Sequence, residues 1–448
     1  MTTGLSAEDF IGGDDDDDLI PMLFATAYFV AVHPTFFGLK EDGTRRKTIR
    51  RRRRTIEGLL EEYGERNFKR AYRMSFASFL DLHTLLHPSI ASRNKAPQRG
   101  GLAQICTKIR LAAAIRYFGG GSVWDIMISH GMSRTETYES VWTVVDSVND
   151  SLPDLQYPTS KEEQSKIARG FVRRSECKFD NCGGCIDGML LWIQQPSPES
   201  CLSAGVGPKK FFCGRKHKFG LNLQAVCDSD RRFIDLSILN PGSASDYLSF
   251  ITSELYRSFC SSPEFLKPGL TIYGDNAYIN NHYMTVPFSN AAGVKDDFNF
   301  YHSQVRMNIE CTFGIFTSRW RILRSPLSSR MSLSKVVALV FCLARLHNFC
   351  IDERIKNSQS DLIVPARHHQ DPLTVYDSEN PEDPPEDLLH GGDHFDDVDG
   401  GRRGANIHNC HANDAYQAAL HPIVPRDEMV EIISTGGWDR QVRTSNIT

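Results

Sequence analysis

The sequence predicts an α/β domain built on a mixed β-sheet, preceded by an all-helical region. Two patterns support this prediction. Residues 180–352 alternate segments of strand and helix character, whereas residues 66–150 show helical periodicity throughout. The chain has 448 residues, 40% of them hydrophobic, which is enough for two or three domains with cores of their own.

Charge is strongly segregated along the chain. The net charge of −4 is unlike that of a uniformly basic nucleic-acid binder. However, residues 14–18 are five consecutive aspartates, and residues 377–399 carry ten acidic residues and no Lys or Arg. Blocks of one sign belong to tails and linkers rather than to packed cores. Without its acidic tail, the central part of the chain is basic.

These patterns divide the chain into five regions. The tail is rich in Pro, Asp and Glu and is expected to be largely disordered, with a short helix near residues 426–434. The regions are an acidic start with an apolar segment (1–44), a basic run and linker (45–65), the helical region (66–150), the α/β domain (180–352) and the acidic tail (356–448).

The basic run is dense enough to be a nuclear import signal. An arm that binds phosphates is the alternative, and both roles are compatible. Nuclear localisation is therefore expected. Its eight basic residues are Arg45, Arg46, Lys47, Arg50, Arg51, Arg52, Arg53 and Arg54.

The apolar segment, residues 19–39, contains no Asp, Glu, Lys or Arg and approaches the length of a membrane span, roughly 20 residues. Pro21, His33 and Pro34 interrupt it, so only residues 22–32 are helical and apolar. That stretch is too short to span a bilayer. The pattern favours a buried or partner-docking helix over a membrane anchor.

Twelve cysteines without regular spacing are typical of thiols in a reducing compartment. Cys177, Cys182 and Cys185 suggest part of a zinc site. A structural zinc needs four ligands, and no second close pair follows. Core thiols are therefore the favoured interpretation.

The helical region contains a helix-turn-helix-like pattern. A helix over 102–118 ends at three glycines, and Ser122 can cap a short helix through Ser129. After a turn at Gly131, Ser133 and Glu136 form a capping box for the next helix. The apolar face of that helix is expected to comprise Tyr138, Val141, Trp142, Val145 and Val148.

Arg134, Thr135 and Thr137 lie near the start of this second helix, where recognition helices touch base edges. They are therefore candidate DNA contacts. The alternative is an ordinary helical hairpin that packs on the α/β domain.

Within the α/β domain the elements follow the order strand, hairpin, helix, strand, helix, which fits an RNase H-like mixed sheet. In such a sheet the first strand and the strand before Asp275 are neighbours, and the last helix packs across them. The expected elements are a strand ending in a Gly turn at 185–189, strands 219–227 and 233–239, a helix over 244–259, a strand over 270–278 and a helix over 303–320.

Three carboxylates stand at informative positions in this order: Asp187, Asp275 and Glu310. Their mutual repulsion would be relieved by a dication. Mg²⁺ (or Mn²⁺) favours carboxylates with water and phosphate oxygens, and two ions about 4 Å apart suit phosphodiester chemistry. Alternatively, Asp187 caps a turn, Asp275 belongs to an Asp-Asn turn and Glu310 is a surface charge.

Several motifs resemble the catalytic domain of the PIF/Harbinger superfamily of DDE transposases. The resemblance covers about residues 180–350, with the motifs in the right order. They are Cys-Ile-Asp-Gly at 185–188, Phe-Gly-Leu-Asn-Leu-Gln-Ala-Val-Cys-Asp at 219–228, Asn-Pro-Gly-Ser-Ala-Ser-Asp at 240–246, Gly-Asp-Asn-Ala-Tyr at 274–278, Arg-Met-Asn-Ile-Glu-Cys-Thr-Phe-Gly at 306–314 and Arg-Trp-Arg-Ile-Leu at 319–323.

The resemblance implies that Asp187, Asp275 and Glu310 bind the metals. It also implies cleavage at transposon ends and joining of the 3′-hydroxyl to target DNA. The family usually has His before the aspartate of its Gly-Ser motif, whereas Ser245 precedes Asp246 here. This departure puts a catalytic role at that position in doubt, but not the three carboxylates.

Basic residues near these carboxylates are candidate contacts to DNA phosphates. The alternative for the cluster between the first two strands is a solvated loop. Arg306, one turn before Glu310, is expected to pair with it or to touch substrate. The cluster consists of Lys209, Lys210, Arg215, Lys216, His217 and Lys218, of which the Lys and Arg residues are the candidate contacts.

The expected function is a metal-dependent endonuclease and transposase acting on double-stranded DNA. The resemblance also implies a Myb-like DNA-binding partner, since such elements encode one. A homo-oligomer is left open. The alternatives are a domesticated nuclear protein that binds DNA or partners without cutting, a ribonuclease acting on RNA–DNA hybrids, and a membrane-anchored adaptor using residues 19–39.

Overall fold

The structure, a computed structural model, describes residues 53–93, 105–175, 179–202, 204–361 and, near the C-terminus, residues 426, 429 and 430. The described helices and strands belong to one compact unit. The acidic start, the apolar segment, residues 45–52 and most of the tail lie outside the described residues. The predictions made for them therefore stay predictions. Of the expected helix over 426–434, the three described residues are helical.

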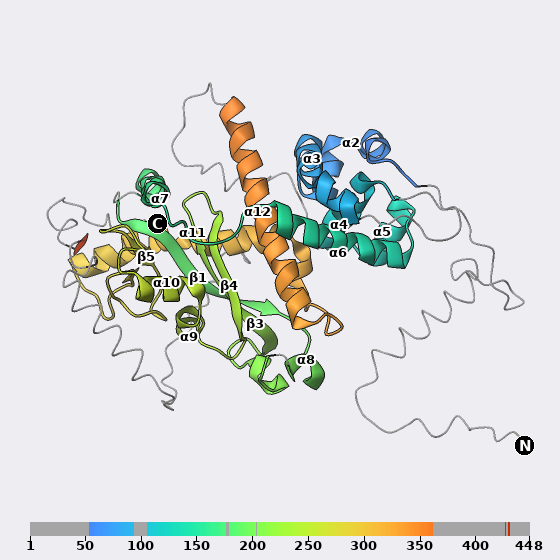
Figure 1. Ribbon diagram of the computed structural model, residues 1–448. Helices are drawn as coiled ribbons and strands as arrows, with labels where there is room; N and C mark the ends of the chain where they lie inside the picture. Colours follow the sequence, from blue (N-terminus) through green and yellow to red (C-terminus); the bar gives the residue numbers. More distant parts are fainter. Residues whose placement is uncertain are drawn as a thin grey trace, which may run out of the picture. The chain divides into compact units, whose positions relative to one another are not determined.

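A mixed sheet forms the centre of the α/β region (Figure 1). β1 pairs antiparallel with β3, which pairs antiparallel with β4, and β1 pairs parallel with β5, which pairs parallel with β6. This is the α/β mixed sheet predicted from the element order. The strands are β1 (Cys182–Trp192), β2 (Phe212–Cys213), β3 (Lys218–Cys227), β4 (Phe233–Pro241), β5 (Thr271–Tyr273) and β6 (Met284–Thr285).

β1 is longer than the sequence suggested. The expected turn at Gly188 does not occur, because Gly188 pairs with Gln224 in a ladder with β3 that extends from Cys185 to Trp192. Pairing along this whole length outweighs the weak strand propensity of glycine. Gly184 accommodates a register shift against β5 with φ of 152°. Asp187 therefore lies in the middle of a strand and not at its end.

Two helices depart from their predicted bounds. The helix expected over 244–259 is divided into α9 (Asp246–Ile251) and α10 (Glu254–Ser261), because Ser253 starts a new helix by capping the amide of Tyr256. α11 (Val294–Arg319) begins nine residues earlier than the expected start at 303. Its acidic first turn, with Asp296 and Asp297, suits a helix N-terminus. The short α8 (Pro198–Leu202) and η2 (Pro208–Phe211) connect β1 to β2.

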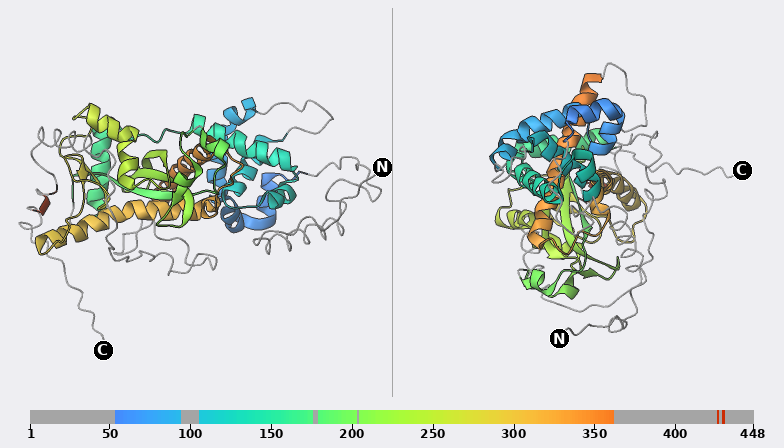
Figure 2. Two further views of the ribbon diagram at one scale, coloured as in Figure 1. Left: turned by 90° about the horizontal axis from the view of Figure 1, so that it is seen from below. Right: turned by 90° about the vertical axis from the view of Figure 1, so that its right-hand side faces the viewer.

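The two faces of the sheet are covered by different helices. The Cys185 thiol donates to the carbonyl of Val305 at 3.2 Å, so this face of β1 contacts α11. Ile186 points to the other face, where it packs in a cluster with Phe250 of α9 and Leu255 of α10. Figure 2 shows α11 as a single long helix beside the sheet. Cys182 and Cys185 are both buried, as expected of core thiols.

The predicted helices before the sheet are present, although α4 begins at Thr107 and not at the expected residue 102. Ser122 caps α5, Gly131 ends it in the left-handed conformation, and Ser133 with Glu136 forms the predicted capping box. The helices are α2 (Ile56–Tyr72), kinked at Gly64, α3 (Phe76–Arg93), α4 (Thr107–Phe118), α5 (Val123–His130), α6 (Arg134–Ser151) and α7 (Lys161–Arg174).

The buried face of α6 is rotated from the predicted one. Val141, Val144 and Val148 are buried, whereas Tyr138 is 37% exposed and Trp142 only half-buried. The difference arises because α6 also packs against α12 (Leu333–Asp361). The core around α11 continues into these helices, where Phe118 meets Trp320 with ring centroids 6.3 Å apart.

α12 connects this core to β4. Its stretch Leu333–Asn357 is long and apolar enough to cross a membrane by length and composition, yet 61% of its apolar 18-residue window is buried inside the protein. Asn348 of α12 accepts a hydrogen bond from the backbone of Phe233 at 2.9 Å. The apolar character of this helix is explained by its packing in the core.

Candidate active site

Asp187 lies where one edge of β1 loses its strand partner. β5 pairs with β1 only as far as Cys185, and the next bridge on β1 joins Ile193 to Leu327. In the described chain, no strand covers residues 186–191 on this edge. Asp187 points to the same face as Cys185, toward α11.

β5 ends at Tyr273, earlier than the predicted strand end at 278, and Asp275 follows it by two residues. The charge of Asp275 acts on Asp187. Oδ1 of Asp275 accepts the amide of Ala277 at 2.9 Å, which is the turn role considered from the sequence. The two roles do not conflict, because a carboxylate has a second oxygen and further lone pairs.

The environment of Asp187 disfavours its ionised form. Burial is the main reason, and the negative charge of Asp275 adds to it, so that the pKa of Asp187 is raised from 3.8 to about 7. The amide of Gly188, which donates to Asp187 at 2.7 Å, and the charge of Arg306 act in the opposite direction. A buried carboxylate whose pKa is raised by desolvation and a neighbouring charge is a common feature of functional sites.

Arg306 lies among the three predicted carboxylates. It forms the expected i,i+4 ion pair with Glu310, at 2.6 Å between Nη2 and Oε1. Its Nη1 lies 3.9 Å from Oδ2 of Asp187, and its charge also interacts with Asp275. Arg306 thus supplies the positive charge that balances these carboxylates in the metal-free protein.

The donor chemistry of the site fits a hard dication, since Asp187, Asp275 and Glu310 all offer carboxylate oxygens. Among the described residues, however, no group of three or more His, Cys, Asp or Glu side chains is arranged to hold a metal ion. The charge of Asp275 acts on Asp187, whereas Glu310 is 48% exposed and forms an ion pair with Arg306. Arg306 would therefore compete with a metal ion for Glu310.

A polar network that the sequence reading missed lies behind Gly188, on the α9 side of the sheet. Asp246 accepts hydrogen bonds from Nδ2 of Asn222 at 3.0 Å and Nε2 of Gln224 at 3.1 Å. The hydroxyl of Tyr278 donates to Gln224 at 2.7 Å. The available signal was the pair of buried polar residues, Asn222 and Gln224, in the otherwise apolar β3.

A groove of about 840 Å³ runs along the open edge of β1, and we call it the edge groove. It begins beside Gly188, Asp246 and Ala277 and continues to Trp192. The ammonium of Lys218 lies 4.1 Å from the centre of the Trp192 ring. The basic residues that line the groove are Arg215, Lys216, Lys218 and Arg324.

Residues 186–348 match the family model described as DDE superfamily endonuclease. This segment is similar to members of that family. It contains all three predicted carboxylates, and the resemblance to Harbinger-type DDE nucleases is confirmed at the level of the family.

A curated relative of the chain is Protein ALP1-like of Arabidopsis thaliana. The two are 26% identical over 259 residues, which cover 54% of this chain and 60% of the relative. The chain therefore spans less than two thirds of the relative's length. No solved structure matches the chain.

The basic cluster predicted near the DDE carboxylates is exposed, and part of it faces the edge groove. Arg215, Lys216 and Lys218 line the groove. Lys209 and Lys210, in η2, are exposed but are not among the lining residues.

The predicted contacts at the start of α6 have a mixed outcome. Arg134 and Thr135 are exposed. Thr137 is fully buried and its hydroxyl donates to the carbonyl of Ser133 at 2.9 Å, so the prediction that Thr137 faces DNA is wrong for this conformation. The same hollow of the surface also contains the carboxylates of Glu139 and Asp146, which would repel phosphates.

Only the end of the basic run is described. Arg54 pairs with Glu62 at 2.8 Å and donates to the hydroxyl of Tyr63 at 3.2 Å, just before α2 begins. Arg45–Arg52 lie outside the described residues.

Proposed function

We propose that the protein is a metal-dependent endonuclease that cuts duplex DNA, with Asp187, Asp275 and Glu310 as its catalytic carboxylates. The observation that carries the proposal is the pair of Asp187 and Asp275 at the open edge of β1, where the charge of Asp275 raises the pKa of Asp187. The nearby residues Gly188 and Ala277 line a groove that also contains basic residues. The similarity of the matched segment to the DDE superfamily endonucleases supports the proposal.

In this proposal the site's own residues have separate tasks. Asp187, Asp275 and Glu310 would hold two Mg²⁺ or Mn²⁺ ions, which supply activation of the attacking oxygen and stabilisation of the leaving one. Arg306 balances the carboxylates until the ions arrive and keeps Glu310 close to Asp187. Arg215, Lys216 and Lys218 attract the phosphate backbone into the edge groove. The joining of cut ends to target DNA is the transposase part of the same proposal.

A nicking assay tests the proposal, with duplex DNA that carries the ends of the transposable element from which the protein derives. We expect cleavage with Mg²⁺ or Mn²⁺, none with chelator, and at least roughly a hundredfold loss in Glu310→Gln, because a ligand of the ions is removed. Asp296→Asn is the matched control, an acid-to-amide change on the exposed start of the same helix, and should cut normally. Metal-independent cutting, or full activity in Glu310→Gln, would contradict the assignment.

A domesticated protein that binds DNA without cutting is the second candidate. The ion pair between Glu310 and Arg306 favours it, because it neutralises a carboxylate that a nuclease needs. In that case the parent protein would bind duplex DNA but remain inactive with either metal. An RNA–DNA hybrid included in the same assay distinguishes the ribonuclease alternative.

We further propose nuclear import through Arg45–Arg54 and recognition of the DNA ends with the help of a separate, Myb-like protein. The start of α6 offers one exposed arginine, Arg134, beside two carboxylates, which is little for sequence readout. A titration of the purified protein on its own ends and on scrambled DNA tests the partner. Discrimination of about a thousandfold or more by the protein alone, a typical specificity ratio, would remove the need for one.

A fluorescent fusion with Arg50–Arg54 neutralised tests nuclear import and should remain cytoplasmic.

A further inference from the structure

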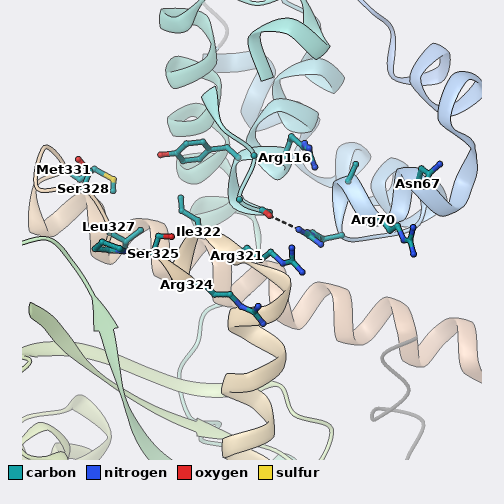
Figure 3. Close-up of a pocket in the computed structure, with 17 residues that line it drawn as sticks. Asn67, Arg70, Arg116, Arg321, Ile322, Arg324, Ser325, Leu327, Ser328 and Met331 are labelled. Atoms are coloured by element: carbon teal, nitrogen blue, oxygen red, sulfur yellow. Dashed lines mark hydrogen bonds between the residues drawn. The ribbon is translucent and has the colours of Figure 1, made fainter. Parts of the chain in front are cut away.

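Five arginines from three separate parts of the chain surround one pocket of about 950 Å³, which we call the arginine pocket. They come from the end of α2, from α4 and from the short helix η3 (Arg321–Arg324). Figure 3 shows the side chains of Arg70, Arg116, Arg321 and Arg324 reaching the same region from these different elements. The fifth arginine is Arg73.

The pocket is held together by close backbone packing. A side chain at Gly120, which has φ of 93°, would place its Cβ 3.0 Å from the Cβ of Arg321, so the glycine allows η3 to approach the end of α4. Arg73 donates to the carbonyl of Gly119 at 2.8 Å. These contacts fix the distance between α2, α4 and η3, and the arginines are therefore presented by a built site.

The charge of the pocket is one-sided. None of its 17 lining residues is Asp or Glu. Five of them are arginines, of which Arg116 pairs with Asp125 at 3.1 Å. Guanidinium groups suit phosphate oxygens because their donors form a planar fork. The pocket therefore fits a ligand with several negative charges.

Arg324 connects this pocket to the edge groove, because it lines both. A polymer that enters the edge groove beside Gly188 can therefore continue past Arg324 to Arg70 and Arg321. A free phosphate or nucleotide would use only one end of this path. A phosphodiester backbone uses all of it.

We propose that the arginine pocket binds the sugar-phosphate backbone of duplex DNA next to the bond that is cut. This inference rests on the proposed function for the identity of the polymer. It assigns the main sequence-independent contact to α2, α4 and η3, away from the start of α6, where Glu139 and Asp146 accompany a single arginine.

The experiment measures binding to a labelled duplex of unrelated sequence, with chelator present, over a series of salt concentrations. Arg70→Gln and Arg321→Gln should each weaken binding about three- to tenfold and lower the salt slope by about one, the value for one lost phosphate contact. Arg70→Lys should keep most of the slope, because it keeps the charge. Arg66→Gln is the matched control, since Arg66 is exposed on α2 but does not line the pocket.

Melting curves establish that the variants fold. Both are expected to do so, because Arg70 is exposed and Arg321→Gln retains the Cβ that packs on Gly120. Unchanged affinity and slope in both variants, or an equal loss in Arg66→Gln, would overturn the inference while leaving the nuclease proposal intact. Tighter binding by the variants would also overturn it. A parent protein that binds no DNA would overturn the inference and the proposed function together.

Discussion

Asp187→Asn is expected to abolish metal-dependent cleavage and, at the same time, to stabilise the metal-free protein. The loss of activity should be roughly a thousandfold or more, as for other members of a catalytic group that acts as a unit. The gain in stability follows from the raised pKa of Asp187, because burial and the charge of Asp275 penalise its ionised form in the folded state. Asparagine has a similar shape and carries no charge.

The pH dependence of this effect has a definite sign. An acid whose folded pKa exceeds its unfolded pKa is protonated more in the folded state, so the stability of the parent falls as pH rises from about 4 through about 7. The full shift corresponds to about 4 kcal/mol as an upper limit, and screening at this partly exposed carboxylate reduces the expected gain in Asp187→Asn to about 2 kcal/mol.

Urea denaturation of parent and Asp187→Asn in chelator, at several pH values, measures this difference. The variant should be more stable at pH 8, and the two proteins should converge near pH 4. Asp296→Asn, which removes an exposed carboxylate, should show no such pattern. A variant that is less stable than the parent at pH 8 would mean that Asp187 is satisfied by partners in the folded protein and is not strained by Asp275.

Gly188→Ala is expected to impair the site although it adds one methyl group and removes no charge. The new Cβ would lie 1.9 Å from Oδ1 of Asp246 and 2.6 Å from Nε2 of Gln224, far inside contact distance. Neither group can move away freely, because Asn222 and Tyr278 hold them by hydrogen bonds. β1 or α9 must therefore shift next to Asp187.

Overpacking of this kind costs about 1–3 kcal/mol of unfolding free energy. A displacement of about 1 Å at the reacting groups can cost about a hundredfold in rate. We therefore expect a lower melting temperature and at least roughly a hundredfold slower single-turnover cleavage. Gly214→Ala is the matched control, since Gly214 also lines the edge groove but its Cβ would meet nothing within 4 Å. Equal behaviour of the two variants would show that the Gly188 contact is unimportant.

The sequence predicted the mixed sheet because its segments follow the order strand, hairpin, helix, strand, helix, and few sheets accommodate that order. It failed at Gly188, where glycine suggested a turn. Ladder pairing of β1 with β3 is a long-range property that local propensity does not contain. The break between α9 and α10 was missed for the opposite reason, since the cap at Ser253 is local but lies inside an apolar helical pattern.

The candidate site was only partly visible in the sequence. The motifs located Asp187, Asp275 and Glu310, and the i,i+4 spacing predicted the pair of Arg306 and Glu310. The arginine pocket could not be predicted, because Arg70, Arg116 and Arg321 are far apart in the chain and meet only through tertiary packing.

The position of bound metal tests the central claim most directly. Crystals of the full protein soaked with Mn²⁺ allow the ions to be located by anomalous scattering. We expect Mn²⁺ in contact with Asp187 and Asp275, with Glu310 released from Arg306 and completing the site. Mn²⁺ bound elsewhere, or a Glu310 that remains paired with Arg306 at a saturating concentration of metal, would contradict the assignment of these three residues as one metal-binding group.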